Sequence, residues 1–138
     1  MERKKKYKLN IEGKVPIHLL GILSDETDLK LSWLINQNLL INLSRDDDLN
    51  WLSRELPNPL AFPVYSDLYS KYGPVRLLKN RTLEGLWIKG YKQVDYLFMV
   101  ISELDKTTNR NLLDKLQATS NIRGIYSLDP GPLEPWMG

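Results

Sequence analysis

The chain has 138 residues, of which 42% are hydrophobic, and its 19 basic and 17 acidic side chains give a formal net charge of +2. That length suits one compact domain of roughly 100 to 200 residues, and the apolar content suffices for a hydrophobic core. The absence of cysteine excludes disulfides, thiol nucleophiles and thiolate metal sites, and it favours the cytoplasm over an oxidising compartment.

The first segment is basic but does not continue as an export signal. Residues 1–6 carry positive side chains, whereas residues 7–14 alternate polar and apolar where a signal peptide needs an apolar segment. The alternation predicts a strand followed by a turn. The next apolar run, residues 15–23, is far shorter than the ~20 residues that cross a bilayer. We therefore expect no membrane partner and predict a central strand that is covered on both faces.

A helix is predicted next, because Ser24 precedes an acidic run at residues 25–28 in the pattern of an N-cap and an acidic first turn. The helix is predicted to end near Asn38, and alternation over residues 39–44 predicts a third strand. Residues 46–61 lack sustained periodicity. They predict an irregular connection with one helical turn at residues 50–56.

A β-hairpin is predicted in the middle of the chain, where residues 62–69 and 75–79 flank a Gly-Pro turn. Pro63 lacks an amide donor, which favours an edge strand or the first position of a strand. Residues 95–102 form an unbroken run of aromatic and branched side chains. This run predicts a second strand that is buried on both faces.

The last third predicts a helix capped at Asp105 and a final strand over residues 122–128. An extended tail, residues 129–138, follows. It carries Trp136 between prolines and glycine, and this side chain is a candidate contact of the tail. Two alternatives stay open: the tail folds back over an apolar groove, or it docks into a partner.

The order strand, helix, strand occurs on both sides of the hairpin. It favours an α+β fold with a single mixed or largely antiparallel sheet and two main helices on one face. We expect one domain over residues 1–138, with a basic flexible start at 1–6 and the tail at its end.

Motifs for catalysis or cofactor binding are missing from the sequence. The glycines are dispersed and form no dinucleotide or phosphate-binding loop. His18 is the only histidine, so no histidine-paired metal motif exists, and no serine lies in a nucleophile elbow. We predict no catalytic residue, no cofactor and no metal.

Residues 88–96 carry a recognisable pattern. Ile88 and, at the right spacing, Val94-Asp95-Tyr96 match a signature of Ile-Pro-Glu, three spacer residues and Val-Asp-Tyr. The chain thereby resembles the IPExxxVDY family, an uncharacterised bacterial family. Lys89 and Gly90 stand where the signature has Pro-Glu. The resemblance implies a small cytoplasmic bacterial protein and carries no substrate with it.

Positive charge is concentrated in the same part of the chain, since residues 71–92 hold six basic side chains and one acidic. With the interspersed aromatics they define a candidate binding surface of Arg76, Lys79, Arg81, Trp87, Tyr91, Lys92, Asp95 and Tyr96. We predict a non-catalytic module that binds a protein partner. The alternative is RNA, whose bases stack on aromatics beside cations.

Two structural interpretations stand beside these hypotheses. Basic side chains also keep exposed hairpins soluble, and strand aromatics usually pack the core. Asp95 begins an apolar strand, where a carboxylate is either perturbed and usable as an acid, base or anchor, or held by a partner that pins a turn.

Overall fold

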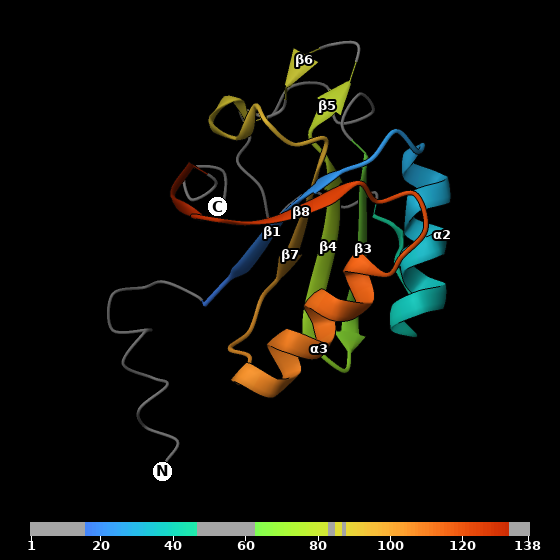
Figure 1. Ribbon diagram of the computed structural model, residues 1–138, viewed down its shortest axis with the longest axis vertical. Coiled ribbons are helices and arrows are strands. Elements are labelled where there is room, and N and C mark those ends of the chain that lie inside the picture. The colour runs from blue at the N-terminus through green and yellow to red at the C-terminus, as the bar shows by residue number, and fades with distance from the viewer. Residues whose placement is uncertain (1–15, 47–62, 83–84, 87, 133–138) are drawn as a thin grey trace.

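The computed structural model describes residues 16–46, 63–82, 85–86 and 88–132. Two α-helices and one large sheet make up this part of the chain (Figure 1). In chain order the elements are β1 (His18–Leu23), α2 (Asp28–Leu39), β2 (Ser44–Arg45), β3 (Val64–Ser70), β4 (Gly73–Lys79), β5 (Arg81–Thr82), β6 (Gly85–Leu86), a 3-10 turn η1 (Lys89–Tyr91), β7 (Tyr96–Val100), α3 (Lys106–Gln117) and β8 (Gly124–Leu128).

The large sheet has six strands in the order β2-β3-β4-β7-β1-β8, and each neighbouring pair is antiparallel. β5 and β6 form a separate two-stranded ribbon. The predicted α+β fold with a largely antiparallel sheet is thus confirmed. β1 and β7 lie inside the sheet, as their continuous apolar sequences predict, because a strand with both faces covered has no polar face to alternate.

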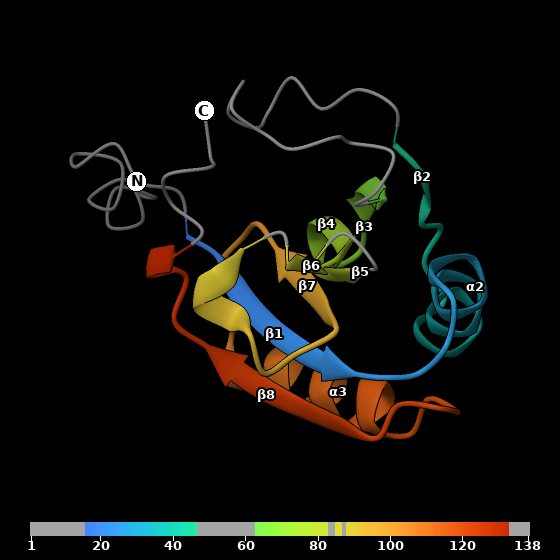
Figure 2. The same ribbon diagram turned by 90° about the horizontal axis from the view of Figure 1, so that it is seen from above.

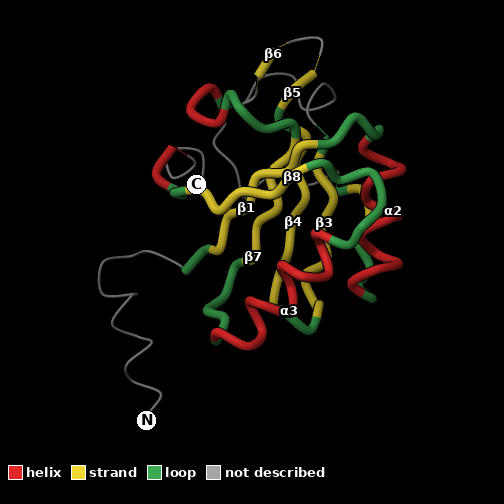
Figure 3. The backbone as a smooth tube through the Cα atoms, viewed as in Figure 1, coloured by secondary structure: helices red, strands yellow, loops and turns green. Residues whose placement is uncertain are grey.

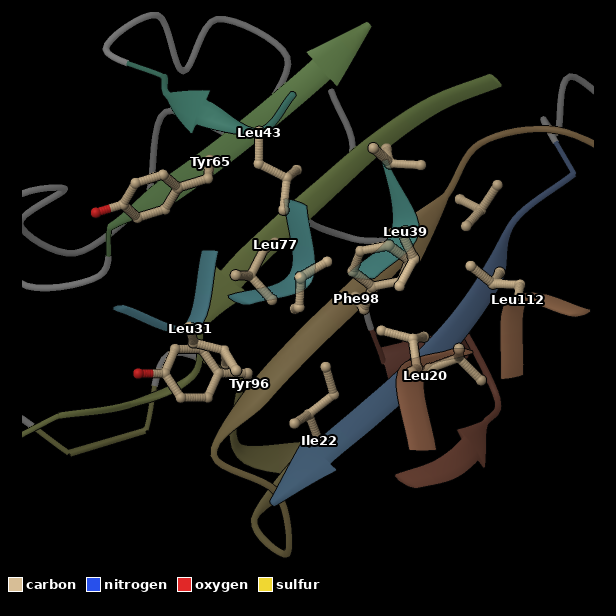
Figure 4. Close-up of a cluster of buried hydrophobic side chains, with 14 of the residues drawn as sticks. Leu20, Ile22, Leu31, Leu39, Leu43, Tyr65, Leu77, Tyr96, Phe98 and Leu112 are labelled. Carbon is tan, nitrogen blue, oxygen red and sulfur yellow. The ribbon is translucent and has the colours of Figure 1, made fainter. Parts of the chain in front are cut away.

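Both helices cover the same face of the sheet (Figures 1 and 3). Alternate residues of β7 point to this face, and the close-up shows Tyr96 and Phe98 among the helix side chains (Figure 4). Leu31, Ile35 and Leu39 of α2 and Leu112 and Leu116 of α3 complete the cluster and are fully buried. Burial of each such side chain contributes about 1.5–3 kcal/mol, so this cluster is the main source of stability.

The opposite face of the sheet has its own smaller core. Leu97 and Met99, which alternate with the helix-facing residues of β7, pack there against Ile88, Tyr91 and Val94 of the loop that precedes the strand. Ile88, Tyr91 and Val94 therefore cover the face without helices, whereas Tyr96 points to the helix-bearing face.

The first helix begins later than predicted. Thr27, not Ser24, is the N-cap, and its side chain accepts a hydrogen bond from the Lys30 amide. The Ser24 hydroxyl donates to the carbonyl of Asn121 at 2.8 Å and accepts from the Glu26 amide at 3.1 Å, two residues on. Ser24 therefore closes a turn before the helix, and Thr27 takes the N-cap position.

The third strand, predicted over residues 39–44, is shorter than predicted. Leu39 belongs to α2, and the strand β2 contains Ser44 and Arg45 alone. The side chain of Asn36 accepts from the Leu43 amide at 2.6 Å and donates to its carbonyl at 3.0 Å. Because a side chain satisfies these backbone groups, residue 43 has no need of a strand partner.

The predicted hairpin over residues 62–69 and 75–79 is present as β3-β4, and Pro63 immediately precedes β3. Its turn lies at residues 71–72 and not at Gly73-Pro74, which begin β4. Asp105 caps α3 by accepting from the Thr108 amide at 2.7 Å. The predicted strand at 7–11, the helical turn at 50–56, Trp87 and Trp136 lie outside the described residues. None of the described helices is long and apolar enough to span a membrane.

Candidate functional site

The signature loop, residues 88–95, is held by a buried amide side chain that the sequence analysis did not single out. Asn80 is fully buried at the end of β4. Its side chain accepts from the Ile88 amide at 2.9 Å and donates to the carbonyls of Tyr91 at 3.0 Å and Val94 at 3.4 Å. One side chain thereby satisfies three backbone groups of the loop.

Two glycines let the signature loop approach its neighbours closely. A Cβ on Gly21 of β1 would lie 2.5 Å from Val94 Cγ1, and one on Gly90 would lie 2.7 Å from Pro132 Cβ. Tyr91 is buried between these contacts, and its hydroxyl donates to the carbonyl of Asp129 at 2.7 Å. The loop is consequently packed from both sides, and Gly90, which departs from the signature, leaves room for Pro132.

Asp95 connects three strand ends. Its carboxylate accepts from the Ser24 amide at 3.0 Å after β1, pairs with Arg81 Nε at 3.2 Å after β4, and lies 3.9 Å from Arg123 Nη2 before β8. Its backbone carbonyl accepts from the amides of Asn80 and Arg81. A carboxylate with this many partners is an anchor of the fold, which is one of the two interpretations left open by the sequence.

Tyr96 belongs to the core and not to an outer surface. It is almost fully buried, and its hydroxyl donates to the carbonyl of Glu26 at 2.5 Å. Burial, with the nearby carboxylate of Asp28, raises the pKa of Tyr96 well above its usual range. Burial and a hydrogen bond to Asp28 likewise raise the pKa of Tyr65 to about 12. Both phenols are neutral at physiological pH.

The basic side chains of the candidate surface are separated from one another. Arg76 and Lys79 are three residues apart on β4 and so point to opposite faces of the sheet. Arg76 pairs with Asp46 at 3.0 Å, whereas Lys79 lies 3.8 Å from Asp28 and over the Tyr96 ring. Arg81 is engaged with Asp95 and donates to the carbonyl of Lys92.

The eight predicted surface residues therefore do not form one described patch. Tyr91 and Tyr96 are buried, the three arginine and lysine side chains of β4 and β5 each contact a different carboxylate, and Lys92 is exposed. A small hollow beside Asp95 is lined by Asp25, Glu26, Asn121 and Arg123. Its polar groups pair internally, Arg123 with Asp25 and Asn121 with Glu26.

Among the described ranges, no group of three or more His, Cys, Asp or Glu side chains is arranged to hold a metal ion.

An exposed apolar surface lies on the outside of α2. Leu29 is 70% exposed, Trp33 54% and Leu40 74%. We name these three residues the α2 stripe: Leu29 and Trp33, four positions apart, lie on one side of the helix, and Leu40 is the C-cap just beyond its last residue. The opposite side of α2 is the buried one, with Leu31, Ile35 and Leu39. The helix is apolar on both sides.

Leu40 also has an unusual backbone conformation. It is the C-cap of α2 and has φ 59° and ψ 48°, in the left-handed region. Glycine and asparagine are the usual residues there, because a Cβ raises the energy of this conformation by roughly 1–2 kcal/mol. Leucine at this position is thus both strained and exposed to solvent.

No protein-family model matches the chain, and no curated protein matches it. The exposed α2 stripe could be found from the sequence only by noticing that apolar residues occupy both sides of the helix. The signal is weak, because one wide core-facing side predicts a similar composition.

Proposed function

We propose that the protein is a non-catalytic binding module and that the α2 stripe is its contact surface for another protein. The observation that carries the proposal is a helix whose outer side exposes Leu29 and Trp33, with the ammonium of Lys30, from the same helix, 5.6 Å from the centre of the Trp33 ring. Exposed leucines occur singly on many surfaces, but a tryptophan flanked by two leucines along one helix is typical of interaction sites. Tryptophan is also among the residues most enriched at binding hot spots.

The backbone of Leu40 supports the same proposal. A strained residue that packs in the core can be explained by the packing. The Leu40 amide donates to the Asn36 carbonyl at 2.9 Å, but its side chain is 74% exposed, so little packing offsets the strain. Strain of this kind is concentrated at sites of function. Binding of the leucine side chain to a partner supplies the missing compensation.

The geometry of the stripe favours a helical partner. Leu29 to Leu40 extends about 16 Å along α2, at a rise of about 1.5 Å per residue. A partner helix with apolar residues at helical spacing matches that length. The exposed carboxylate of Asp25, with Glu26 next to it, lies just before the stripe. A basic residue in the last turn of an antiparallel partner helix would meet these carboxylates and suit its own helix dipole.

The central experiment compares the wild-type chain with a Leu29→Gln/Trp33→Gln variant. Partners recovered from native lysate by each bait are quantified, and a protein that the wild type enriches is then purified and titrated against both. We expect the variant to weaken this binary complex by about 30-fold, because loss of a hot-spot aromatic costs about 2 kcal/mol and 1.4 kcal/mol is tenfold.

The matched control is Asn111→Gln/Lys115→Gln, which changes two exposed side chains of α3 instead. It should bind as the wild type does. Equal binding by all three proteins would remove the α2 stripe from the function. Thermal unfolding of each variant accompanies the titration, since the exposed substitutions should leave stability within about 0.5 kcal/mol.

RNA association through residues 71–92 stays a prediction. Three of the six basic side chains, Arg76, Lys79 and Arg81, offer it little support, since each contacts a carboxylate and Arg76 and Lys79 point to opposite faces. A Arg76→Glu/Lys79→Glu/Arg81→Glu variant tests it directly. If RNA is bound through this region, the affinity should fall steeply with salt in the wild type and be lost in the variant.

A further inference from the structure

The two outer edges of the sheet differ in how they are protected from pairing with another strand. At one edge, β2 has two residues, and the register of β3 beyond it shifts between Asp67 and Ser70. Short edge strands and bulges are devices by which proteins prevent edge-to-edge association. At the other edge, β8 has five residues in regular register with β1. It contains no proline, no charge and no bulge.

Among the described residues, no strand pairs with the outer edge of β8, which forms the margin of the sheet (Figure 2). α3 packs on the helix-bearing face behind this strand and does not cover the edge (Figure 2). An edge of this kind presents a row of backbone donors and acceptors to solvent. It is suited to a partner that supplies a further strand.

We propose that this partner is a second copy of the chain and that β8 pairs with β8 of that copy about a two-fold axis. Going beyond the proposed function, the proposal concerns a surface separate from the α2 stripe. Paired in this way, the two sheets become one continuous antiparallel sheet. The contact is isologous, as in most homodimers, because the same strand is used by both copies.

The sequence of β8 and its flanks is complementary to itself in one register. With Tyr126 opposite Tyr126 of the second copy, the whole strand overlaps. Arg123 then faces Asp129 of the other copy, twice by symmetry. Arg123 and Asp129 are both exposed and flank β8 at equal distance from Tyr126. Opposite charges directly across an antiparallel pair are stabilising, and a shift by one position separates them.

Arg123 and Asp129 can still bond to each other across the two-fold axis, although both already have partners in their own chain. Arg123 already lies 3.1 Å from Asp25 Oδ1 and 3.9 Å from Asp95 Oδ2, but a guanidinium has five N–H donors and can bond to several acceptors. One oxygen of Asp129, Oδ1, accepts from the Gly131 amide at 3.1 Å. The second carboxylate oxygen is available to an arginine across the axis.

The side chains of β8 fit a close approach of two strands. Tyr126 is 49% exposed, and its hydroxyl lies 3.3 Å from the position of a Cβ on Gly124, so its ring extends over that glycine. In the proposed register Gly124 faces Leu128 of the other copy, and the two tyrosines lie side by side. Both contacts remove from water apolar surface that the single chain exposes.

The first test uses the absence of cysteine from the chain, so that an introduced cysteine is the only thiol. Facing residues of an antiparallel pair have Cβ atoms about 4.5–5.5 Å apart, close to the reach of a disulfide. Mild oxidation of a Tyr126→Cys variant should therefore yield a disulfide-linked dimer. The control is Tyr69→Cys, at the most exposed tyrosine of the other edge; it should stay monomeric in denaturing electrophoresis.

The second test is a charge exchange, read by sedimentation equilibrium of the full chain over a wide concentration range. Asp129→Arg sets two guanidinium groups against each other and should weaken dimerisation about tenfold or more. Arg123→Glu should weaken it as well, and the double exchange Arg123→Glu/Asp129→Arg should restore it. A wild type that stays monomeric at every concentration overturns the proposal.

Equal crosslinking of the two cysteine variants also overturns it. Hydrogen exchange then identifies what replaces the second copy: protected β8 amides in a monomer would mean that another part of the same chain covers the edge. Weakening by both single exchanges without restoration in the double exchange would contradict the proposed register.

Discussion

The signature loop and the outer side of α2 differ in how fully the fold uses their side chains. In the loop, the apolar residues Ile88 and Val94 are buried, and the carboxylate of Asp95 has three partners from separate strand ends. On α2, Leu29 and Trp33 extend into solvent. Polar groups at a strand end can thus serve the fold alone. An ordinary helix, by contrast, can expose apolar side chains that the fold does not need.

The largest expected effect concerns the loop. Substitution Asn80→Ala should lower the free energy of unfolding by about 3–4 kcal/mol, because it leaves the Ile88 amide and the Val94 carbonyl without their partner at about 1–3 kcal/mol each and takes one of two donors from the Tyr91 carbonyl. Urea unfolding monitored by circular dichroism measures the loss. Asn111→Ala, at an exposed position of α3, is the control and should change stability by under about 0.5 kcal/mol. A loss for Asn80→Ala as small as that of the control would mean that the loop is not held by this side chain.

A second prediction concerns the close contact between Gly21 and Val94. Gly21→Ala should destabilise the protein by about 2 kcal/mol, because its new methyl group overlaps Val94 and cores tolerate such overpacking poorly. In Gly21→Ala/Val94→Ala the added methyl occupies space that the valine vacates. The two substitutions should thus be coupled by about 1 kcal/mol or more in a double-mutant cycle. Additive losses would show that the two residues do not share this contact.

The elements that local patterns determine could be predicted from the sequence. The apolar runs of β1 and β7 and the cap at Asp105 gave strands and a helix at nearly the observed positions. The start of α2 could not be predicted, because the Ser24 hydroxyl accepts from the Glu26 amide in a turn before the helix and donates to Asn121 at the far end of the chain. The strand expected at 39–44 is confined to Ser44 and Arg45, since the Asn36 side chain satisfies the backbone of Leu43.

The candidate site was less predictable than the fold. Residues 71–92 are basic in sequence, but the carboxylates that pair with them, Asp28 and Asp46, lie before the hairpin in the chain. Arg76 and Lys79 also lie on opposite faces of β4. The number of charges along the sequence shows neither which carboxylate pairs with a basic side chain nor to which face of the sheet that side chain points.

A third prediction concerns how the free energy of unfolding depends on pH through Tyr65 of β3. Burial and the hydrogen bond to Asp28 raise the pKa of Tyr65 to about 12 from the usual tyrosine value of 10.0. Above pH 10 the unfolded chain loses this proton before the folded one does, so the stability that the neutral phenol contributes is present below pH 10 and is lost as pH rises toward 12. Denaturant titrations at several alkaline pH values should show this decline.

The matched variant is Tyr65→Phe, which removes the titrating group and keeps the ring in the core. Its unfolding free energy should be lower than that of the wild type at neutral pH, because the hydrogen bond to Asp28 is lost. Between pH 10 and 12 its decline should be shallower, since Tyr65 no longer contributes to it. Parallel declines in the two proteins would show that Tyr65 is not held neutral by the fold.

The smallest expected effect, and the one that separates the two regions most directly, is a gain in stability on α2. Leu40→Gly should raise the free energy of unfolding by about 0.5–1 kcal/mol, because relief of the left-handed strain exceeds the added entropy of glycine in the unfolded chain. Little burial is lost, since the leucine is 74% exposed. The same substitution should weaken binding of the α2 partner, which is the trade-off expected of a strained contact residue.

Leu40→Ala distinguishes strain from contact in this prediction. Alanine keeps a Cβ in the left-handed conformation, so its stability should stay near that of the wild type, yet it removes the side chain that we propose meets the partner. Both variants should therefore bind more weakly, and the glycine variant alone should be more stable. If Leu40→Gly is more stable and binds as well as the wild type, the strain at the end of α2 has no part in recognition, and the contact surface is confined to Leu29 and Trp33.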